Sequence, residues 1–303
     1  MKYAMLLAGF VIATVAITEA STTDIERAVV RLAELDRPTQ YSLDLSIDYL
    51  DNAIVAIQQV GDDETQSVGF TITEPMNVRI IAMGEGLGRE MYDYGWLVDA
   101  SDHQAVWSMD YSDTFRAGGA TKNRITDEVI RLDAGSYVAY YITDGSHSFG
   151  DWNSSAPRNS ELWGLTILPL DGDASAAASY DPSDDVVARI VRVGDSQHRR
   201  RTFSLDESTT ISVYSLGEGS GGRMYDYASI QRADDHSTVW TMDYDETEWA
   251  GGARKNRMAS ESLTLPAGDY LLRYQSDGSH SYGDWNSPAP HDPSNWGVTI
   301  TSR

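Results

Sequence analysis

The sequence of 303 residues contains no cysteine and almost no lysine. The absence of cysteine excludes disulfide bonds and thiolate metal sites, so a bound metal would need oxygen or imidazole ligands. Lysine occurs only at Lys2, Lys122 and Lys255, and the formal net charge is −23. Such an acidic chain is repelled by nucleic-acid phosphates and by anionic membrane surfaces. We therefore predict no nucleic-acid partner. The acidity suits divalent cations or high salt, or serves solubility alone.

Long apolar runs are also absent after the first 20 residues. Residues 1–20 have the features of a secretory signal peptide: Lys2 gives a positive start, residues 3–17 are apolar, and small residues stand at Thr18 and Ala20. The apolar run is shorter than a good membrane-spanning helix. We therefore predict a cleaved signal peptide and no membrane span after cleavage. The predicted location is extracellular or at the cell surface, with the periplasm as an alternative.

One segment of ten residues occurs twice. Residues 144–153 read Asp-Gly-Ser-His-Ser-Phe-Gly-Asp-Trp-Asn, and residues 277–286 differ from them only by Tyr in place of Phe. The same offset of 133 residues aligns the rest of both copies without insertion or deletion. The sequence therefore predicts two repeats of ordinary domain size, at residues 51–170 and 184–303, joined by a small, polar linker at residues 171–183.

Each repeat consists of short segments that read as β-strands, separated by turn signals. In the second repeat the predicted strands are residues 187–193, 201–205, 210–216, 228–233, 238–244, 261–265, 268–276 and 296–301. The turn signals include Gly61-Asp62, Gly84-Glu85-Gly86, Ala134-Gly135 and residues 266–268. Many short strands with Gly and Asp turns and little helix are typical of a β-sandwich or jelly roll. We predict an all-β chain with two tandem, jelly-roll-like β-sandwich domains.

A leader at residues 21–50 precedes the first repeat. Its residues 41–50 alternate strictly between apolar and polar side chains, which predicts a half-buried strand that the second repeat lacks. This strand either adds to the edge of its own domain or is donated to a neighbouring molecule.

The turn motif Leu-x-Ala-Gly-x-Tyr occurs at residues 132–137 and 265–270. With the order of the strands, it resembles the bacterial pre-peptidase C-terminal domain and related carbohydrate-binding jelly rolls. The resemblance implies secreted accessory β-sandwich modules, some of which bind calcium. The Asp-Gly-Ser-His loop is not part of that family's pattern, so no functional residue is carried over.

The repeated loop contains oxygen ligands suited to calcium, which takes six to eight of them. We predict metal ligation by Asp144 and Asp151, and by their counterparts Asp277 and Asp284, with Asp93 or Asp110 completing the shell. The alternative is a loop without a metal, whose polar groups hydrogen-bond to one another: Asp and Ser side chains cap turns, and the histidine donates to a carbonyl. The other residues predicted to bind a ligand or organise the loop are His147, Trp152, Asn153, Lys122 and Arg124, with their counterparts His280, Trp285, Asn286, Lys255 and Arg257.

Lys122 and Arg124 form a cationic spot that recurs in both repeats of an acidic chain. We predict that they pair with shared carboxylates such as Asp110 or Asp93. A ligand carboxylate or sulfate is the functional alternative.

Catalysis is not predicted, because a Ser, His and Asp on one tight loop rarely reach triad geometry and no nucleophile elbow is present. We predict a secreted, non-enzymatic binding or structural module, with calcium as its cofactor, acting at a cell surface or in an extracellular matrix on a glycan or protein partner. One alternative is a carbohydrate-binding protein, which would need the matched Trp and Tyr side chains on one exposed face. Others are a self-associating filament or adhesin subunit assembled through residues 41–50, and a hydrolytic enzyme.

Overall fold

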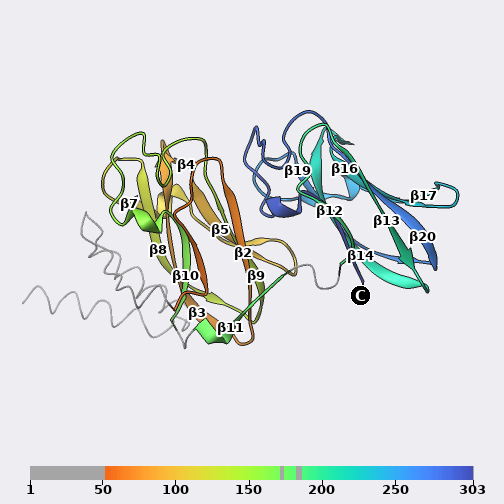
Figure 1. Ribbon diagram of the computed structural model, residues 1–303, viewed down its shortest axis with the longest axis horizontal. Helices are drawn as coiled ribbons and strands as arrows, with labels where there is room; N and C mark the ends of the chain where they lie inside the picture. The colour runs from red at the N-terminus through yellow and green to blue at the C-terminus, as the bar shows by residue number, and fades with distance from the viewer. Residues whose placement is uncertain (1–51, 171–173, 182–185, 303) are drawn as a thin grey trace, which may run out of the picture.

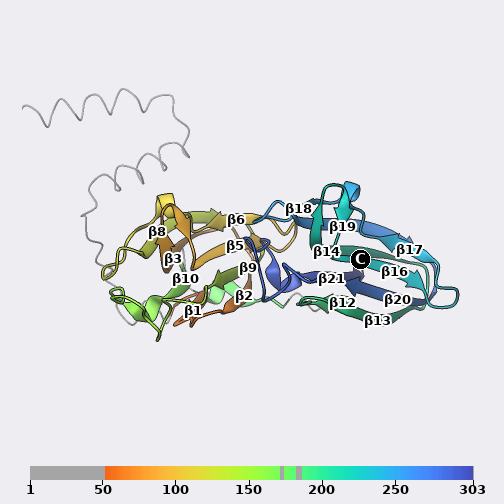
Figure 2. The ribbon, with the colours of Figure 1, turned by 90° about the horizontal axis from the view of Figure 1, so that it is seen from above.

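The computed structural model describes residues 52–170, 174–181 and 186–302. The predicted signal peptide, the leader and its alternating segment lie outside the described residues. Within those ranges the chain is all-β, with short 3₁₀ helices and four antiparallel sheets that form two sandwiches (Figure 1). Figure 2 shows the two sandwiches side by side along the long axis of the molecule. No helix among these residues is long and apolar enough to cross a membrane.

The first repeat folds into two facing sheets. One has the order β1 (Val55–Gln58), β10 (Gly164–Pro169), β3 (Met76–Leu87), β8 (Asn123–Leu132) and β7 (Phe115–Arg116), with β4 (Glu90–Met91) paired to β3. The other has the order β11 (Ala177–Ser179), β2 (Thr65–Ile72), β9 (Gly135–Ile142), β5 (Tyr94–Asp99) and β6 (Ala105–Ser108).

The second repeat has the same arrangement apart from one edge strand. Its first sheet has the order β12 (Val186–Val191), β21 (Gly297–Ser302), β14 (Thr209–Ser220), β19 (Asn256–Leu265) and β18 (Glu248–Trp249), with β15 (Arg223–Met224) paired to β14. Its second sheet has the order β13 (His198–Leu205), β20 (Gly268–Gln275), β16 (Tyr227–Arg232) and β17 (Thr238–Thr241). The 3₁₀ helices are η1 (Tyr111–Asp113), η2 (Ser160–Leu162), η3 (Ala174–Ala176), η4 (Tyr244–Glu246) and η5 (Pro293–Asn295).

The eight strands predicted in the second repeat all overlap observed strands. One predicted turn is wrong, because Gly84, Glu85 and Gly86 lie inside β3, where Gly84 and Glu85 pair with β8 and Gly86 pairs with β4. A Cβ atom on Gly84 would lie 2.0 Å from the backbone oxygen of Asp93. Glycine is required here for the close approach of another backbone segment, not for a turn.

Part of the stretch predicted as a linker adds a strand to the first repeat. The strand β11 pairs with β2, with Ala177 opposite Ile72 and Ser179 opposite Phe70. The backbone after β11 runs so close to β2 that a Cβ atom on Gly69 would lie 2.3 Å from the oxygen of Tyr180. The strand β11 thus covers an edge of the first sandwich that would otherwise present unpaired backbone groups.

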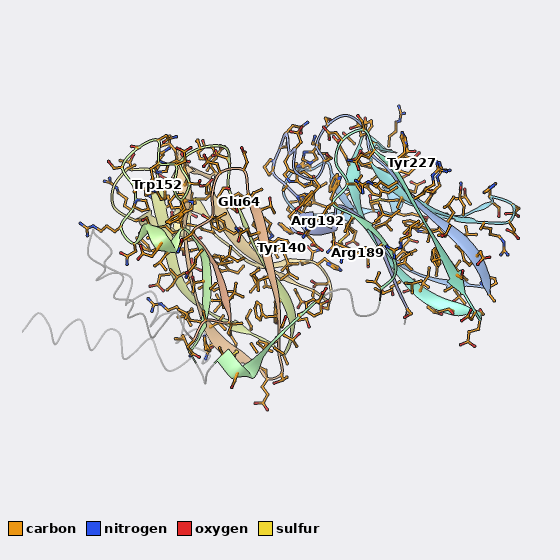
Figure 3. All side chains as sticks on the ribbon, viewed as in Figure 1. Glu64, Tyr140, Trp152, Arg189, Arg192 and Tyr227 are labelled. Carbon is orange, nitrogen blue, oxygen red and sulfur yellow. The ribbon has the colours of Figure 1, made fainter. Side chains whose placement is uncertain are left out.

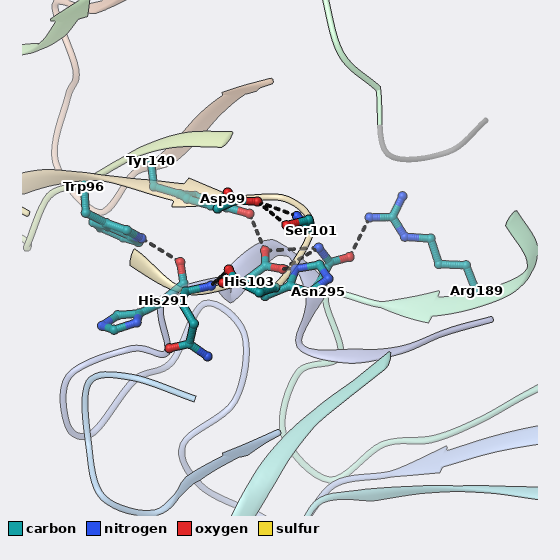
Figure 4. Close-up of polar contacts among 11 residues, drawn as sticks. Trp96, Asp99, Ser101, His103, Tyr140, Arg189, His291 and Asn295 are labelled. Carbon is teal, nitrogen blue, oxygen red and sulfur yellow. Dashed lines mark hydrogen bonds and ion pairs between the residues drawn. The ribbon is translucent and has the colours of Figure 1, made fainter. Parts of the chain in front are cut away.

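The two repeats meet where a loop of the second packs on the outer face of β5 and β9 (Figure 4). That face carries a small buried apolar cluster of Trp96, Val98 and Tyr140. The Trp96 indole donates to the His291 backbone oxygen at 2.6 Å. The Tyr140 hydroxyl donates to Asp292 Oδ1. The interface therefore combines aromatic burial with buried hydrogen bonds.

His103 adds two contacts to this interface. Its Nδ1 lies 2.9 Å from Asp292 Oδ2, and its ring stacks on that of Tyr214 with centroids 3.6 Å apart. Burial alone would raise the pKa of Asp292, but hydrogen bonds from His103, Tyr140 and Asn295 hold it below its ordinary value. Because this folded-state pKa is lowered, the contribution of Asp292 to stability is present above about pH 4 and is lost as the pH falls below it.

Replacing Asp292 by alanine is expected to loosen the contact between the repeats. The change leaves His103 Nδ1 and the Tyr140 hydroxyl without their buried acceptor, at a cost of about 1–3 kcal/mol for each group. Small-angle X-ray scattering should then show a larger radius of gyration for Asp292→Ala. Asp284→Ala, which removes an exposed carboxylate of the same repeat, is the control. Identical scattering of both variants and the parent would contradict this role of Asp292.

Candidate metal centre

Three carboxylates converge at one end of the first sandwich. Oxygen atoms of Glu85, Asp93 and Asp144 all lie within 4.8 Å of one another. Glu85 projects from β3, Asp93 lies between β4 and β5, and Asp144 opens the repeated loop after β9. Glu85 is 6% exposed and Asp93 is 0% exposed. We call this group the first acidic triad.

The second repeat contains the same triad, formed by Glu218, Asp226 and Asp277. Its three residues follow their counterparts at the offset of 133 residues. A Cβ atom on Gly217 would lie 2.0 Å from the Asp226 oxygen, as for Gly84 and Asp93. The duplication has therefore kept both the carboxylates and the close backbone approach that brings them together.

Hydrogen bonds fix the orientation of the central aspartate in each triad. Asp93 Oδ1 accepts from the Asp144 backbone N–H at 2.9 Å, and Asp93 Oδ2 accepts from the Trp163 indole at 3.2 Å. Asp226 accepts the matching bonds, from the backbone of Asp277 at 2.8 Å and from the Trp296 indole at 3.2 Å. Each aspartate is thus held against the core by a fully buried tryptophan.

Only one of the two carboxylate oxygens of the glutamate in each triad has a hydrogen-bond partner. Glu85 Oε1 accepts from Lys122 Nζ at 2.9 Å, whereas the buried Oε2 has no hydrogen-bond partner. Glu218 repeats this with Lys255 at 2.9 Å. A buried acceptor without a partner costs about 1–3 kcal/mol. A cation at the triad would remove this cost.

The triads also hold more negative charge than the nearby lysine balances. Burial, reinforced by the charges of Asp144 and Glu85, raises the pKa of Asp93 to about 8. Burial and the corresponding neighbours raise the pKa of Asp226 to about 7. Burial likewise raises the pKa of Glu85, although Lys122 opposes the shift. An all-oxygen, electron-rich set of this kind fits calcium, a hard cation that prefers carboxylates, backbone carbonyls and water.

The predicted metal ligands fall into two groups. Asp144 and Asp277 belong to the triads, whereas Asp151 and Asp284 are exposed and contribute no oxygen to them. The backbone N–H of Asp151 donates to the Ser148 oxygen at 3.2 Å, closing a tight bridge within the loop.

Sequence reasoning missed the two glutamates. Gly-Glu-Gly occurs at residues 84–86 and again at 217–219, and this shared pattern was the available signal. It was interpreted as a turn because two glycines flank the acid. Asp62 lies near the first triad as well, since its charge raises the pKa of Glu85.

His147 organises the loops from inside the molecule. It is fully buried, and its Nε2 lies 2.6 Å from Asn123 Oδ1. The Asn123 amide donates to the backbone oxygens of Gly118 and Ser155 at 2.8 and 3.0 Å, so its oxygen accepts and His147 Nε2 carries the proton. Burial lowers the pKa of the counterpart His280 to about 4. Both imidazoles are therefore neutral near pH 7 and tie two loops together.

The other predicted loop residues surround this histidine. Trp152 is half-buried and packs edge-on against Trp163 and His147, with ring centroids 4.9 and 5.1 Å apart. Lys122 Nζ donates to Asn153 Oδ1 at 2.7 Å in addition to its bond with Glu85. Trp285, Asn286 and Lys255 make the same contacts in the second repeat.

The predicted ion pairs with Asp93 or Asp110 are not observed for the repeated cations. Lys122 pairs with Glu85 instead. The Arg124 guanidinium donates to Thr114 Oγ1 at 2.8 Å and lies 4.5 Å from the centre of the Tyr111 ring. Arg257 repeats this over the Tyr244 ring at 4.6 Å. Both arginines brace a long loop against the sheet.

Four of the matched tryptophans face inward: Trp163 and Trp296 are 0% exposed, and Trp107 and Trp240 are 8% and 6% exposed. The matched tyrosines Tyr92 and Tyr225 are 39% and 38% exposed. The carbohydrate-binding alternative, which needs matched Trp and Tyr side chains on one exposed face, therefore finds no support at these four tryptophans.

No protein-family model matches the chain, and no curated protein matches it. Among solved structures, the chain is similar to the CUB1-EGF-CUB2 domain of human MASP-1/3, with 11% identity and a TM-score of 0.24 over 81% of this chain and 96% of that chain. It is also similar to the CUB1-EGF-CUB2 domains of rat MASP-1, with 11% identity and a TM-score of 0.25 over 80% and 93%.

Proposed function

We propose that the protein is a secreted, non-catalytic binding protein whose two β-sandwich domains each bind one structural calcium ion at the acidic triad. The observation that carries the proposal is the repeated triad with its buried, unpartnered glutamate oxygen. The strand orders of both repeats support an assignment as jelly-roll modules, because they combine eight principal strands in two facing sheets.

Calcium would connect three segments that lie far apart in the sequence. Glu85 belongs to β3, Asp93 follows β4, and Asp144 begins the repeated loop. Backbone carbonyls and water would complete the six to eight ligands. The ion would thereby fix the loop at residues 144–153, which is the part of the repeat that changed least between the copies.

The surroundings of His147 favour a non-catalytic role. Its Nε2 is committed to Asn123, and burial followed by the charge of Lys122 lowers its pKa. A general base needs an accessible nitrogen near the reacting group. Ser148 is buried beside it, without contact to solvent. These features disfavour the hydrolytic alternative.

The proposed place of action is the cell surface or an extracellular matrix, with a glycan or an extracellular protein as partner. This rests on the predicted signal peptide and on the acidity of the chain. Assembly into a filament through residues 41–50 is a separate prediction, because that segment lies outside the described residues.

Calorimetric titration of the mature chain tests the proposal. After treatment with a chelator, the protein should bind two calcium ions, and Glu85→Gln and Glu218→Gln should each reduce the number to one. Calcium at 100 times its dissociation constant stabilises the folded state by about 2.7 kcal/mol, which raises the melting temperature by several degrees.

Glu90→Gln, which alters an exposed glutamate on the neighbouring strand β4, is the matched control and should retain both ions. The absence of binding heat and of a melting shift, or two ions bound by both Gln variants, would show that the triads do not hold calcium.

A further inference from the structure

The outer faces of corresponding sheets differ sharply between the two repeats. In the first repeat the outer face of β5 and β9 is aromatic and is covered by the second repeat. The second repeat replaces Trp96, Val98 and Tyr140 by Ser229, Gln231 and Arg273. The equivalent face of β13, β20 and β16 is therefore polar and carries no neighbouring repeat.

Positive charge accumulates on this second face. Arg200 on β13 stands directly opposite Arg273 on β20. The corresponding pair in the first repeat is Ser67 opposite Tyr140. Like charges directly opposite one another destabilise a sheet. The arginine pair is thus not a requirement of the fold, and it carries a cost that a bound anion would remove.

A hollow of about 320 Å³ lies over these arginines. Its lining includes Arg200 and Arg273 together with the hydroxyl and amide side chains of Tyr227, Ser229, Gln231 and Thr241, and it includes no carboxylate. We call this surface the cationic face, and Figure 3 labels Tyr227 on it.

The two central arginines lack carboxylate partners. Among the described residues, neither Arg200 nor Arg273 takes part in an ion pair. Arg273 donates only weakly to Gln231 Oε1, at 3.3 Å. Two guanidinium groups that lie side by side without carboxylate partners match the geometry of a bound carboxylate.

We propose that the cationic face binds uronic acid residues of an acidic polysaccharide. The carboxylate of the sugar lies between Arg200 and Arg273, and its hydroxyl groups pair with Ser229, Gln231 and Thr241. The net charge of −23 disfavours anion binding over the acidic remainder of the chain, so this face is the favoured position. The proposal names a ligand class for the proposed binding function and does not depend on the calcium sites.

A second copy of the chain fits the face less well. The loop of the first repeat that matches residues 291–295 carries Arg158 where the docking loop has His291, and Asn159 where it has Asp292. Docking of that loop would bring a further arginine onto a surface that is already cationic. Charge complementarity therefore favours an anionic ligand on the cationic face over the docking loop of a second copy of the chain.

Titration of the full mature chain with trigalacturonate, monitored by calorimetry at saturating calcium, tests the proposal. We expect binding that weakens between about 50 and 500 mM salt because the contact is ionic. Maltotriose, which is neutral, should not bind. The double change Arg200→Gln and Arg273→Gln should reduce affinity at least tenfold. The matched control, Arg223→Gln with Arg254→Gln, removes two exposed arginines elsewhere in the same repeat and should change affinity less than twofold.

Two results would overturn the proposal: no binding of trigalacturonate by the parent, or equal losses in the two double variants. If a sulfated trisaccharide binds where trigalacturonate does not, the face belongs to sulfated glycans instead. Melting temperatures of the same variants with calcium and with chelator keep the two proposals separate, because a normal calcium response beside absent sugar binding rejects only this one.

Discussion

Calcium is expected to bind roughly 50- to 90-fold more tightly at pH 7 than at pH 5, because each triad must release a proton when the ion enters. Burial raises the pKa of Asp93 to about 8 and that of Asp226 to about 7, so both aspartates are protonated at pH 5. Below the pKa, each released proton changes the affinity about tenfold per pH unit.

The affinity of both sites should level off between about pH 7 and pH 8, where the central aspartates lose their protons. Glu85→Gln and Glu218→Gln isolate one site each. Calorimetry in two buffers with different ionisation heats counts the released protons. An affinity that stays constant from pH 5 to 8, without proton release, would contradict the prediction.

Without calcium, the carboxyl groups of Asp93 and Asp226 make the folded state less stable as the pH rises. Their folded-state pKa values lie above the unfolded value of about 4. The stability that they contribute is complete below about pH 4 and is lost as the pH rises through about 7 and 8. Melting curves in chelator should therefore fall across this range, and saturating calcium should oppose the fall.

Gly217→Ala is expected to lower the melting temperature of the second repeat by about 10–20 °C, as for the most damaging single substitutions. The new Cβ atom would lie 2.0 Å from the Asp226 oxygen, and two backbone segments would have to separate to admit it. Because Asp226 is the central carboxylate of its triad, the proposed calcium binding by this repeat should be lost as well.

Gly278→Ala is the matched control. It lies in the repeated loop next to Asp277, and its Cβ atom would meet Ser196 Oγ at 3.5 Å, an ordinary contact. In differential scanning calorimetry of Gly217→Ala, the transition of the second repeat should move to lower temperature and that of the first repeat should stay in place. Gly278→Ala should melt like the parent. Parental melting of Gly217→Ala would show that the backbone approach at Asp226 is dispensable.

The fold could be predicted from local patterns, whereas the site could be predicted only in part. Strands such as β16 and β20 are predicted by the alternation of apolar and polar side chains and by flanking turn residues, which are local signals. The triad depends on Glu85, Asp93 and Asp144, which are distant in the sequence and meet only through sheet pairing. Asp144 was found because its loop is repeated, but Glu85 was hidden between glycines that also signal turns.

The positions at which the two copies agree and those at which they differ serve different purposes. Identical positions revealed His147 and the repeated lysines, which hold each domain together. The contact between the repeats and the cationic face lie where the copies differ, as at Trp96 and Ser229 or at Tyr140 and Arg273. Internal similarity identifies what both domains need, and it passes over what makes each domain distinct.

The contact between the repeats also bears on polymer growth. A loop that docks on an unlike surface makes a head-to-tail contact. A molecule with a docking loop free at one end and a receiving sheet face free at the other would add copies without limit. Here the free sheet carries Ser229 and Arg273 in place of Trp96 and Tyr140, and the free loop carries Asn159 in place of Asp292. Neither free end has the side chains that form the contact between the repeats, so this mode of growth terminates at two domains.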